Sequence, residues 1–93
     1  MKTRKKLISI VWPAYNEEKN IPEMVSEVTR VMKSLSSKYD YEYILVDDGS
    51  TDGTWEKILK EAKSNRKIKG LSLSRNFGQQ LAITAGLDLV RGE

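Results

Sequence analysis

The sequence contains no cysteine and no histidine. The lack of cysteine excludes disulfide bonds and thiolate zinc sites, so the chain needs no oxidising compartment in order to fold. The lack of histidine excludes a Ser-His-Asp triad and an imidazole metal site. Any acid–base or metal chemistry must therefore use carboxylates.

Long apolar segments are also missing. The apolar run from Leu7 to Trp12 is far too short to span a bilayer, and proline and polar residues follow it in place of a cleavage site. We therefore expect no targeting segment, no transmembrane helix and a cytoplasmic location. The net charge is +3, and much of the positive excess lies in a basic cluster at the N-terminus. Such a cluster could contact anionic lipid or nucleic acid, but it is also typical of a solvated terminus, and we expect no nucleic-acid partner. The cluster consists of Lys2, Arg4, Lys5 and Lys6.

Hydrophobic residues make up 39% and charged residues 31% of the 93 residues, which is the composition of an ordinary globular chain. A chain of this length has room for one modest core. We therefore predict a single domain over residues 1–93.

Hydrophobic periodicity predicts three strands alternating with three helices. The first strand is expected to be buried on both faces and to end at Pro13. Asn20 is the expected N-cap of the first helix, and Gly92 the C-cap of the third. The order predicts a three-layer α/β fold with a parallel sheet and right-handed crossovers. The expected strands are Leu7–Trp12, Tyr41–Val46 and Ile68–Ser74, and the expected helices are 21–35, 55–65 and 79–90.

Unusual loops follow all three predicted strands, and ligands bind beyond the carboxyl ends of the strands in an open parallel sheet. The loops are PAYNEE at 13–18, DDGSTDGT at 47–54 and RNFG at 75–78. None of them matches GxGxxG or GxxxxGK[ST], so a dinucleotide-dependent dehydrogenase or a P-loop NTPase is poorly supported.

The second loop begins with two adjacent carboxylates, Asp47 and Asp48, which repel one another unless donors bind them. The N–H groups of a uracil or guanine base are suitable donors, and Gly49 allows a close approach of the backbone. An alternative interpretation is that both carboxylates cap the loop and the following helix while facing water.

The first loop offers the flat ring of Tyr15 to a base and the carboxylate of Glu17 to a ribose hydroxyl, while Asn16 is suited to hold the turn. A polar turn followed by a helix cap would account for the same residues.

In the third loop, Arg75 could neutralise a diphosphate, with Asn76 and Gly78 shaping the turn. A solvated surface charge is the alternative interpretation of Arg75.

Together these segments resemble the family 2 glycosyltransferases of the GT-A fold, whose domain is Rossmann-like. The resemblance is closest to polyprenyl-phosphate transferases, namely dolichol-phosphate mannosyltransferases and bactoprenol glucosyltransferases. It covers nearly the whole chain from Leu7 onward. The segments that carry it are VWPAYNEE (11–18), YILVDDGSTDGT (43–54) and LSRNFGQQLAITAGLDLVRGE (73–93).

The resemblance implies an inverting transfer from a UDP- or GDP-sugar to a polyprenyl or dolichyl phosphate, assisted by magnesium or manganese. Full-length members are often associated with the cytoplasmic face of a membrane. The resemblance further implies that Asp48, alone or with Asp47, hydrogen-bonds the base. The other residues implied in the nucleotide pocket are Pro13, Tyr15, Asn16, Glu17, Arg75, Asn76 and Gly78.

Members of the family continue past the position of Glu93 into a strand that ends in an Asp-x-Asp metal motif and then into an acceptor-binding half. No catalytic residue and no metal ligand is therefore assigned in this chain, and we predict that the chain alone does not complete the reaction. The family's strand order also implies that Leu7–Val11 forms an exposed apolar edge, through which the chain could self-associate. Trp12 departs from the family, in which a small or aliphatic residue usually precedes the proline.

Two other function classes compete with an enzyme fragment. A stand-alone nucleotide-binding module would keep the same loops. A receiver-like signalling domain would share ILVDD at 44–48 with this chain, but it requires an aspartate at the end of a later strand, where Ser74, Arg75 and Asn76 stand here.

Overall fold

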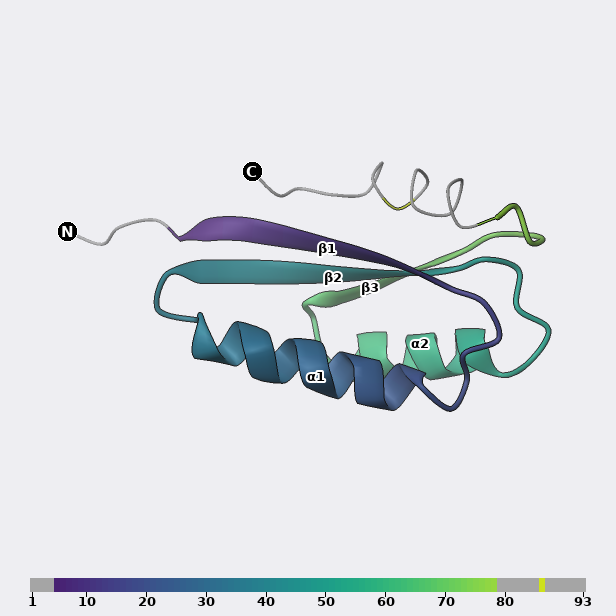
Figure 1. The fold of residues 1–93 in the computed structure, drawn as a ribbon, viewed down its shortest axis with the longest axis horizontal. Helices are drawn as coiled ribbons and strands as arrows, with labels where there is room; N and C mark the ends of the chain where they lie inside the picture. The colour runs from purple at the N-terminus through teal and green to yellow at the C-terminus, as the bar shows by residue number, and fades with distance from the viewer. Residues whose placement is uncertain (1–4, 79–85, 87–93) are drawn as a thin grey trace.

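The computed structural model describes residues 5–78 and residue 86, and over residues 5–78 the chain alternates strands with helices. All strand pairs are parallel and the strand order is β1-β2-β3. Figure 1 shows α1 and α2 side by side on one face of this sheet. The α/β class with a parallel sheet is therefore confirmed. The elements are β1 Lys6–Ala14, α1 Ile21–Ser34, β2 Tyr39–Asp47, α2 Thr54–Ser64 and β3 Ile68–Ser72.

Strand β2 is the centre of the core, because it pairs with β1 on one side and β3 on the other. Tyr43, Ile44, Leu45 and Val46 are all buried. Alternation divides them between the two faces of the sheet. Tyr43 and Leu45 belong to the cluster that includes helix residues, whereas Ile44 and Val46 belong to a second cluster with Val11, Leu71 and Leu73.

The helices form where the apolar spacing predicts them and turn one apolar face to the sheet. Helix α1 buries Ile21, Val25 and Met32, and α2 buries Ile58. Asn20 is the residue before α1, as expected, but its side chain makes no cap hydrogen bond. It donates instead to Glu17 Oε2 at 2.7 Å.

Strand β1 differs from the prediction in two respects. It does not end at Pro13, which pairs with Val46, and it continues to Ala14. Proline is tolerated because the Ala14 carbonyl oxygen accepts the Asp48 N–H at 2.9 Å, so that Ala14 faces β2 and position 13 faces away from it. The strand is also half-buried and not buried on both faces, with Trp12 50% exposed.

The second face of the sheet is covered in part by Gly86, which is helical and buried. A Cβ atom at this position would lie 2.4 Å from Val11 Cγ1 and 2.9 Å from Val46 Cγ2, so the backbone of residue 86 lies directly on the sheet. The rest of the predicted third helix and its C-cap Gly92 lie outside the described residues. Strand β3 ends at Ser72, two residues earlier than expected.

A buried carboxylate on the same face links the three strands. Glu42 on β2 is 1% exposed. Its carboxylate accepts a hydrogen bond from Ser9 Oγ of β1 at 2.5 Å and forms an ion pair with Lys69 Nζ of β3 at 2.9 Å. A buried charge is tolerated only when it is paired and hydrogen-bonded in this way.

Candidate functional site

A pocket of about 350 Å³ lies at the carboxyl ends of the strands, where the three loops meet. Pro13, Ala14, Tyr15 and Glu17 line it from the first loop, Asp48 from the second, and Asn76 and Gly78 from the third. A larger cavity of about 510 Å³ lies between β1 and α1, but its lining is mostly apolar. The smaller pocket is the candidate ligand site, because polar groups from all three loops converge on it.

Asp48 lies at the centre of this pocket and is 3% exposed. Its Oδ1 accepts the Phe77 N–H at 2.9 Å, and its Oδ2 accepts the Gly78 N–H at 3.1 Å. The side-chain amide of Asn76 donates to the Asp48 carbonyl oxygen at 3.2 Å and to Oδ2 at 3.3 Å. The carboxylate of Asp48, which follows β2, therefore helps to determine the conformation of the loop after β3.

Asp47 does not line the pocket. It is 3% exposed, and its Oδ1 accepts the Ser50 N–H at 3.0 Å, which closes the start of the second loop. The two adjacent carboxylates thus have separate donors within the chain, and their repulsion does not by itself require a ligand. For Asp47 the geometry is that of a local turn.

Gly49 of the second loop lies close to the backbone of the third loop. Its φ is +71°, and a Cβ atom there would lie 2.2 Å from the backbone carbonyl carbon of Arg75. Only glycine satisfies both conditions. The close approach predicted for this position therefore occurs between two loops of the chain.

Asn16 joins the first loop to the second. Its Oδ1 accepts the Thr51 N–H at 2.9 Å, and its own N–H donates to Ser50 Oγ at 2.9 Å. Its φ of +53° lies in the left-handed region, which asparagine tolerates better than most residues. The side chain holds the turn, as the sequence indicated, and leaves the neighbouring Tyr15 on the pocket wall.

Thr54 makes a second connection between these loops. It is completely buried, and its Oγ1 accepts the Glu17 N–H at 2.9 Å. Its hydroxyl donates to Asp52, and its N–H donates to Asp52 Oδ1 at 2.9 Å. These bonds, led by the one from the hydroxyl, lower the pKa of Asp52. Glu18 adds a further connection by accepting the Gly53 N–H at 3.0 Å.

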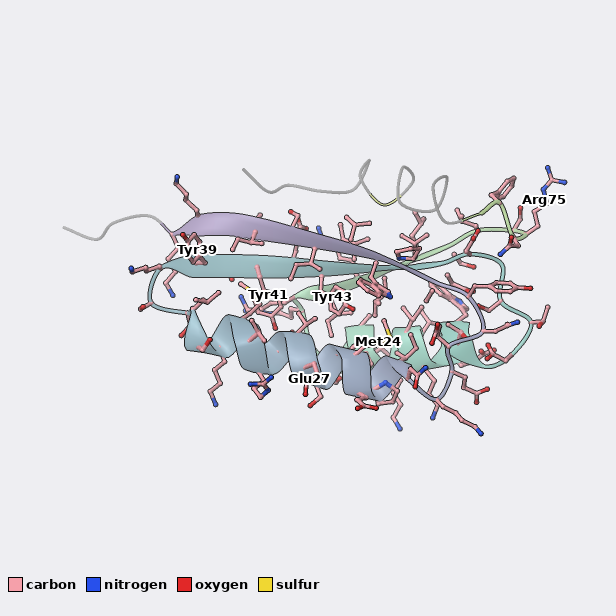
Figure 2. The ribbon with its side chains drawn as sticks, viewed as in Figure 1. Met24, Glu27, Tyr39, Tyr41, Tyr43 and Arg75 are labelled. Carbon is pink, nitrogen blue, oxygen red and sulfur yellow. The ribbon has the colours of Figure 1, made fainter. Side chains whose placement is uncertain are left out.

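Arg75 lies next to the pocket but does not line it. Its guanidinium carbon lies 4.8 Å from the centroid of the Phe77 ring, a cation–π contact. Figure 2 shows Arg75 at the extremity of the molecule where the loops meet. The structure therefore brings together Tyr15, Glu17, Asp48, Asn76 and Gly78 as predicted, and leaves Arg75 on the rim.

The sequence did not indicate the roles of Thr54, Glu18 and Phe77. Thr54 and Glu18 act through backbone groups more than 30 residues away, and Phe77 contributes its N–H, which every non-proline residue has. The Asp52 carboxylate accepts the Thr54 N–H at the start of α2, where Gly53 is the N-cap residue.

The described residues contain no group of three or more carboxylate, histidine or cysteine side chains able to hold a metal ion. Asp47 and Asp48 are turned to different backbone donors and do not form such a group. The described residues therefore do not by themselves fit a divalent cation.

The fold defines a class of protein: the chain has the α/β fold of the N-terminal half of Rossmann-like GT-A glycosyltransferases. It is similar to a mannosyltransferase from Pyrobaculum calidifontis in complex with GDP-Man and Mn²⁺, with a TM-score of 0.76 and 23% identity over 98% of this chain and 26% of that one. It also matches S. aureus TarS with a TM-score of 0.64 and 29% identity, over 95% of this chain and 25% of that one.

The family model described as glycosyl transferase family 2 matches residues 9–93, and the chain belongs to that family. An undecaprenyl-phosphate 4-deoxy-4-formamido-L-arabinose transferase of Aeromonas hydrophila is 45% identical over 89 residues, covering 95% of this chain and 27% of the relative. The Pseudomonas fluorescens protein of the same name is 41% identical over 88 residues, covering 92% and 25%. The chain thus spans about a quarter of the length of the curated relatives it matches.

Proposed function

We propose that this chain is the nucleotide-binding part of a glycosyltransferase that transfers a hexose from a UDP- or GDP-sugar to a polyprenyl or dolichyl phosphate. The observation that carries the proposal is the pocket shared by all three loops, in a chain that belongs to glycosyl transferase family 2. Relatives named as undecaprenyl-phosphate transferases support the lipid phosphate, and a fold neighbour bound to GDP-Man supports the donor.

The base would occupy the space between Tyr15 and Asp48. The Tyr15 side chain is among the exposed large hydrophobic residues, at 45%, so that its ring can stack on a base. The carboxylate of Asp48 already accepts the N–H groups of Phe77 and Gly78 and the amide of Asn76, and a carboxylate has about four acceptor positions. One position remains for a base N–H.

The ribose and the diphosphate would lie toward the rim of the same pocket. Glu17 Oε2 already accepts the Asn20 amide at 2.7 Å, and its second oxygen could accept a ribose hydroxyl. Pro13 and Gly78 complete the wall. Arg75 would have to turn away from the Phe77 ring in order to pair with the diphosphate. In this proposal Asn16 and Asp47 hold the loops and do not touch the nucleotide.

The reaction proposed for the full-length enzyme is a single displacement. A phosphate oxygen of the acceptor attacks the anomeric carbon of the donor, the bond from that carbon to the diphosphate breaks, and the bonding electrons leave on the diphosphate. One displacement inverts the anomeric configuration. Magnesium or manganese would neutralise the leaving group in that enzyme, through ligands outside the described residues.

We further propose that residues 1–93 form one nucleotide-binding domain that binds without turnover. The absence of a metal-binding group from the described residues and the length of the relatives support this. No helix among the described residues is long and apolar enough to cross a membrane. The lipid acceptor of the relatives supports a site of action at the cytoplasmic face of a membrane.

Isothermal titration of the chain with UDP and GDP, with and without Mg²⁺ or Mn²⁺, tests the pocket. One of the two nucleotides should bind, and Tyr15→Ala should weaken it about tenfold, since base stacking contributes about 1–3 kcal/mol. Tyr39→Ala is the matched control, because Figure 2 places Tyr39 at the other end of β2 from the Arg75 loop. Equal losses in the two variants, or no binding of either nucleotide, would contradict the proposal.

Incubation with a donor sugar and undecaprenyl phosphate tests turnover separately. Binding without product formation is the expected result. Formation of a lipid-linked sugar by the 93-residue chain would overturn the proposed lack of turnover, while leaving the nucleotide pocket intact.

A further inference from the structure

Glu17 of the first loop lies between the beginnings of two helices. Its N–H donates to Oγ1 of Thr54, the first residue of α2, at 2.9 Å. Its carbonyl oxygen accepts the N–H of Asn20 at 2.9 Å and that of Ile21, the first residue of α1, at 3.1 Å. Figure 1 shows that α1 and α2 both begin at the end of the molecule where the loops meet. The backbone of Glu17 is therefore held on both sides by groups within the chain.

A third contact holds the Glu17 side chain. Asn20 Nδ2 donates to Glu17 Oε2 at 2.7 Å, a short bond to a charged acceptor. Glu17 lines both the pocket of about 350 Å³ and the cavity of about 510 Å³, whereas Asn20 lines the larger cavity and not the pocket. The bond therefore holds one carboxylate oxygen on the side of the larger cavity. The other oxygen, Oε1, accepts no hydrogen bond from the described residues and stays available to the pocket.

The hydroxyl of Thr54 is suited to accept the Glu17 N–H because its own hydrogen is already used. Thr54 is completely buried, and its hydroxyl donates to the carboxylate of Asp52. Its backbone N–H donates to the same carboxylate at 2.9 Å. With its hydrogen engaged there, the hydroxyl oxygen can only accept from Glu17. Valine has nearly the same shape as threonine but no hydroxyl, so it would leave the Glu17 N–H without an acceptor.

We propose that Asn20 and Thr54 are positioning residues, which hold the Glu17 carboxylate where its second oxygen meets a ribose hydroxyl. This inference rests on the proposed nucleotide pocket. Neither residue lines that pocket, so both act through Glu17. Asn20 precedes α1 but makes no side-chain cap bond, so its amide serves the carboxylate and not the helix. A carboxylate that is already held loses less conformational freedom when a ligand binds, which raises the affinity.

Titration calorimetry with UDP, GDP and their 2′-deoxy and 3′-deoxy analogues tests the positioning role. One deoxy analogue should bind the native chain about tenfold more weakly than its ribonucleotide, because a hydrogen bond to a charged acceptor is lost. This ratio should fall to about one in Glu17→Ala and to about two in Asn20→Ala and Thr54→Val, in which the carboxylate is less well placed. Thr54→Ser restores the hydroxyl and should restore the ratio. A purely structural role would weaken both nucleotides equally and leave the ratio unchanged.

Asn65→Ala is the matched control, because Asn65 follows the far end of α2 and its Oδ1 accepts the Lys67 N–H at 2.9 Å. This variant should keep the full ratio. Asn20 is exposed, so Asn20→Ala keeps the test decisive even if Thr54→Val does not fold. An unchanged ratio in Asn20→Ala, or equal binding of ribonucleotide and deoxy analogues to the native chain, would overturn the positioning role and leave the nucleotide pocket intact. No binding of any nucleotide would overturn both proposals.

Discussion

The carboxylate of Asp48 at the end of β2 accepts the backbone N–H of Gly78 at 3.1 Å, so a residue of the second loop sets the course of the third. Phe77 donates to the other oxygen at 2.9 Å. The position of the third loop is thus fixed by a side chain 30 residues earlier in the sequence.

Replacing Asp48 by alanine should therefore destabilise the chain by about 1–3 kcal/mol, because two backbone N–H groups lose their acceptor. Asp40→Ala is the matched control: Asp40 is exposed, and its ion pair with Lys67 should contribute at most about 1 kcal/mol. Urea unfolding measures both values. Hydrogen exchange should also become faster at Phe77 and Gly78 in the first variant alone. Equal costs for the two variants would contradict this role for Asp48.

Gly49 and Gly78 both have positive φ angles but different surroundings. A Cβ atom at Gly49 would overlap the backbone of Arg75 and Asn76, whereas at Gly78 it would meet nothing within 4 Å. We expect Gly49→Ala to cost about 2–5 kcal/mol, from backbone strain and overlap together, and Gly78→Ala about 1–2 kcal/mol from strain alone. Thermal unfolding of the two variants checks the order, and the reverse order would show that the loops do not approach at Gly49.

Asn16 combines a left-handed backbone with a hydrogen bond to Thr51. Asn16→Gly should lose only the hydrogen bond, at about 1 kcal/mol, whereas Asn16→Ala should lose the bond and also strain the backbone, at about 2–3 kcal/mol. Denaturant midpoints of the two variants measure the difference. A glycine variant less stable than the alanine variant would refute the assigned conformation.

Asp52 links stability to pH. The hydroxyl of Thr54 lowers the pKa of this carboxyl below its ordinary value of 3.8. A carboxyl with a lowered pKa stabilises the folded chain above its unfolded value, and this stabilisation is lost as the pH falls through the folded value. The melting temperature should therefore decrease below about pH 4, and Asp52→Asn should flatten part of that decrease. An unchanged acid profile in the variant would show that Asp52 makes no such contribution.

The sequence predicted the presence and type of the strands and helices better than the residues at which they end. The apolar run of β2 and the spacing of α1 and α2 are local signals, and both led to the observed structure. Pro13 was expected to end β1, yet the strand continues through it. A proline is tolerated at position 13 because the backbone of that residue faces away from β2. The side of β1 that faces β2 is set by pairing with residues more than 30 positions away in the sequence.

In the site, too, local residue types were predicted and contacts between distant segments were not. The rule that ligands bind at the carboxyl ends of parallel strands placed Tyr15, Asp48 and Asn76 at one pocket, as the structure does. The donors that bind Asp47 and Asp48 within the chain could not be predicted, because Ser50, Phe77 and Gly78 supply backbone groups and not recognisable side chains. The direction of Arg75 depends on the neighbouring Phe77 ring.

The connections between the three loops have a consequence for folding. They join residues 28 to 37 positions apart, as in Asn76 to Asp48 and Glu17 to Thr54. Such long-range contacts form only after the strands have paired, so a partly folded chain has no pocket. Any molecule that occupies the pocket should then raise the melting temperature of the entire chain, which makes thermal shift a simple screen for its natural ligand.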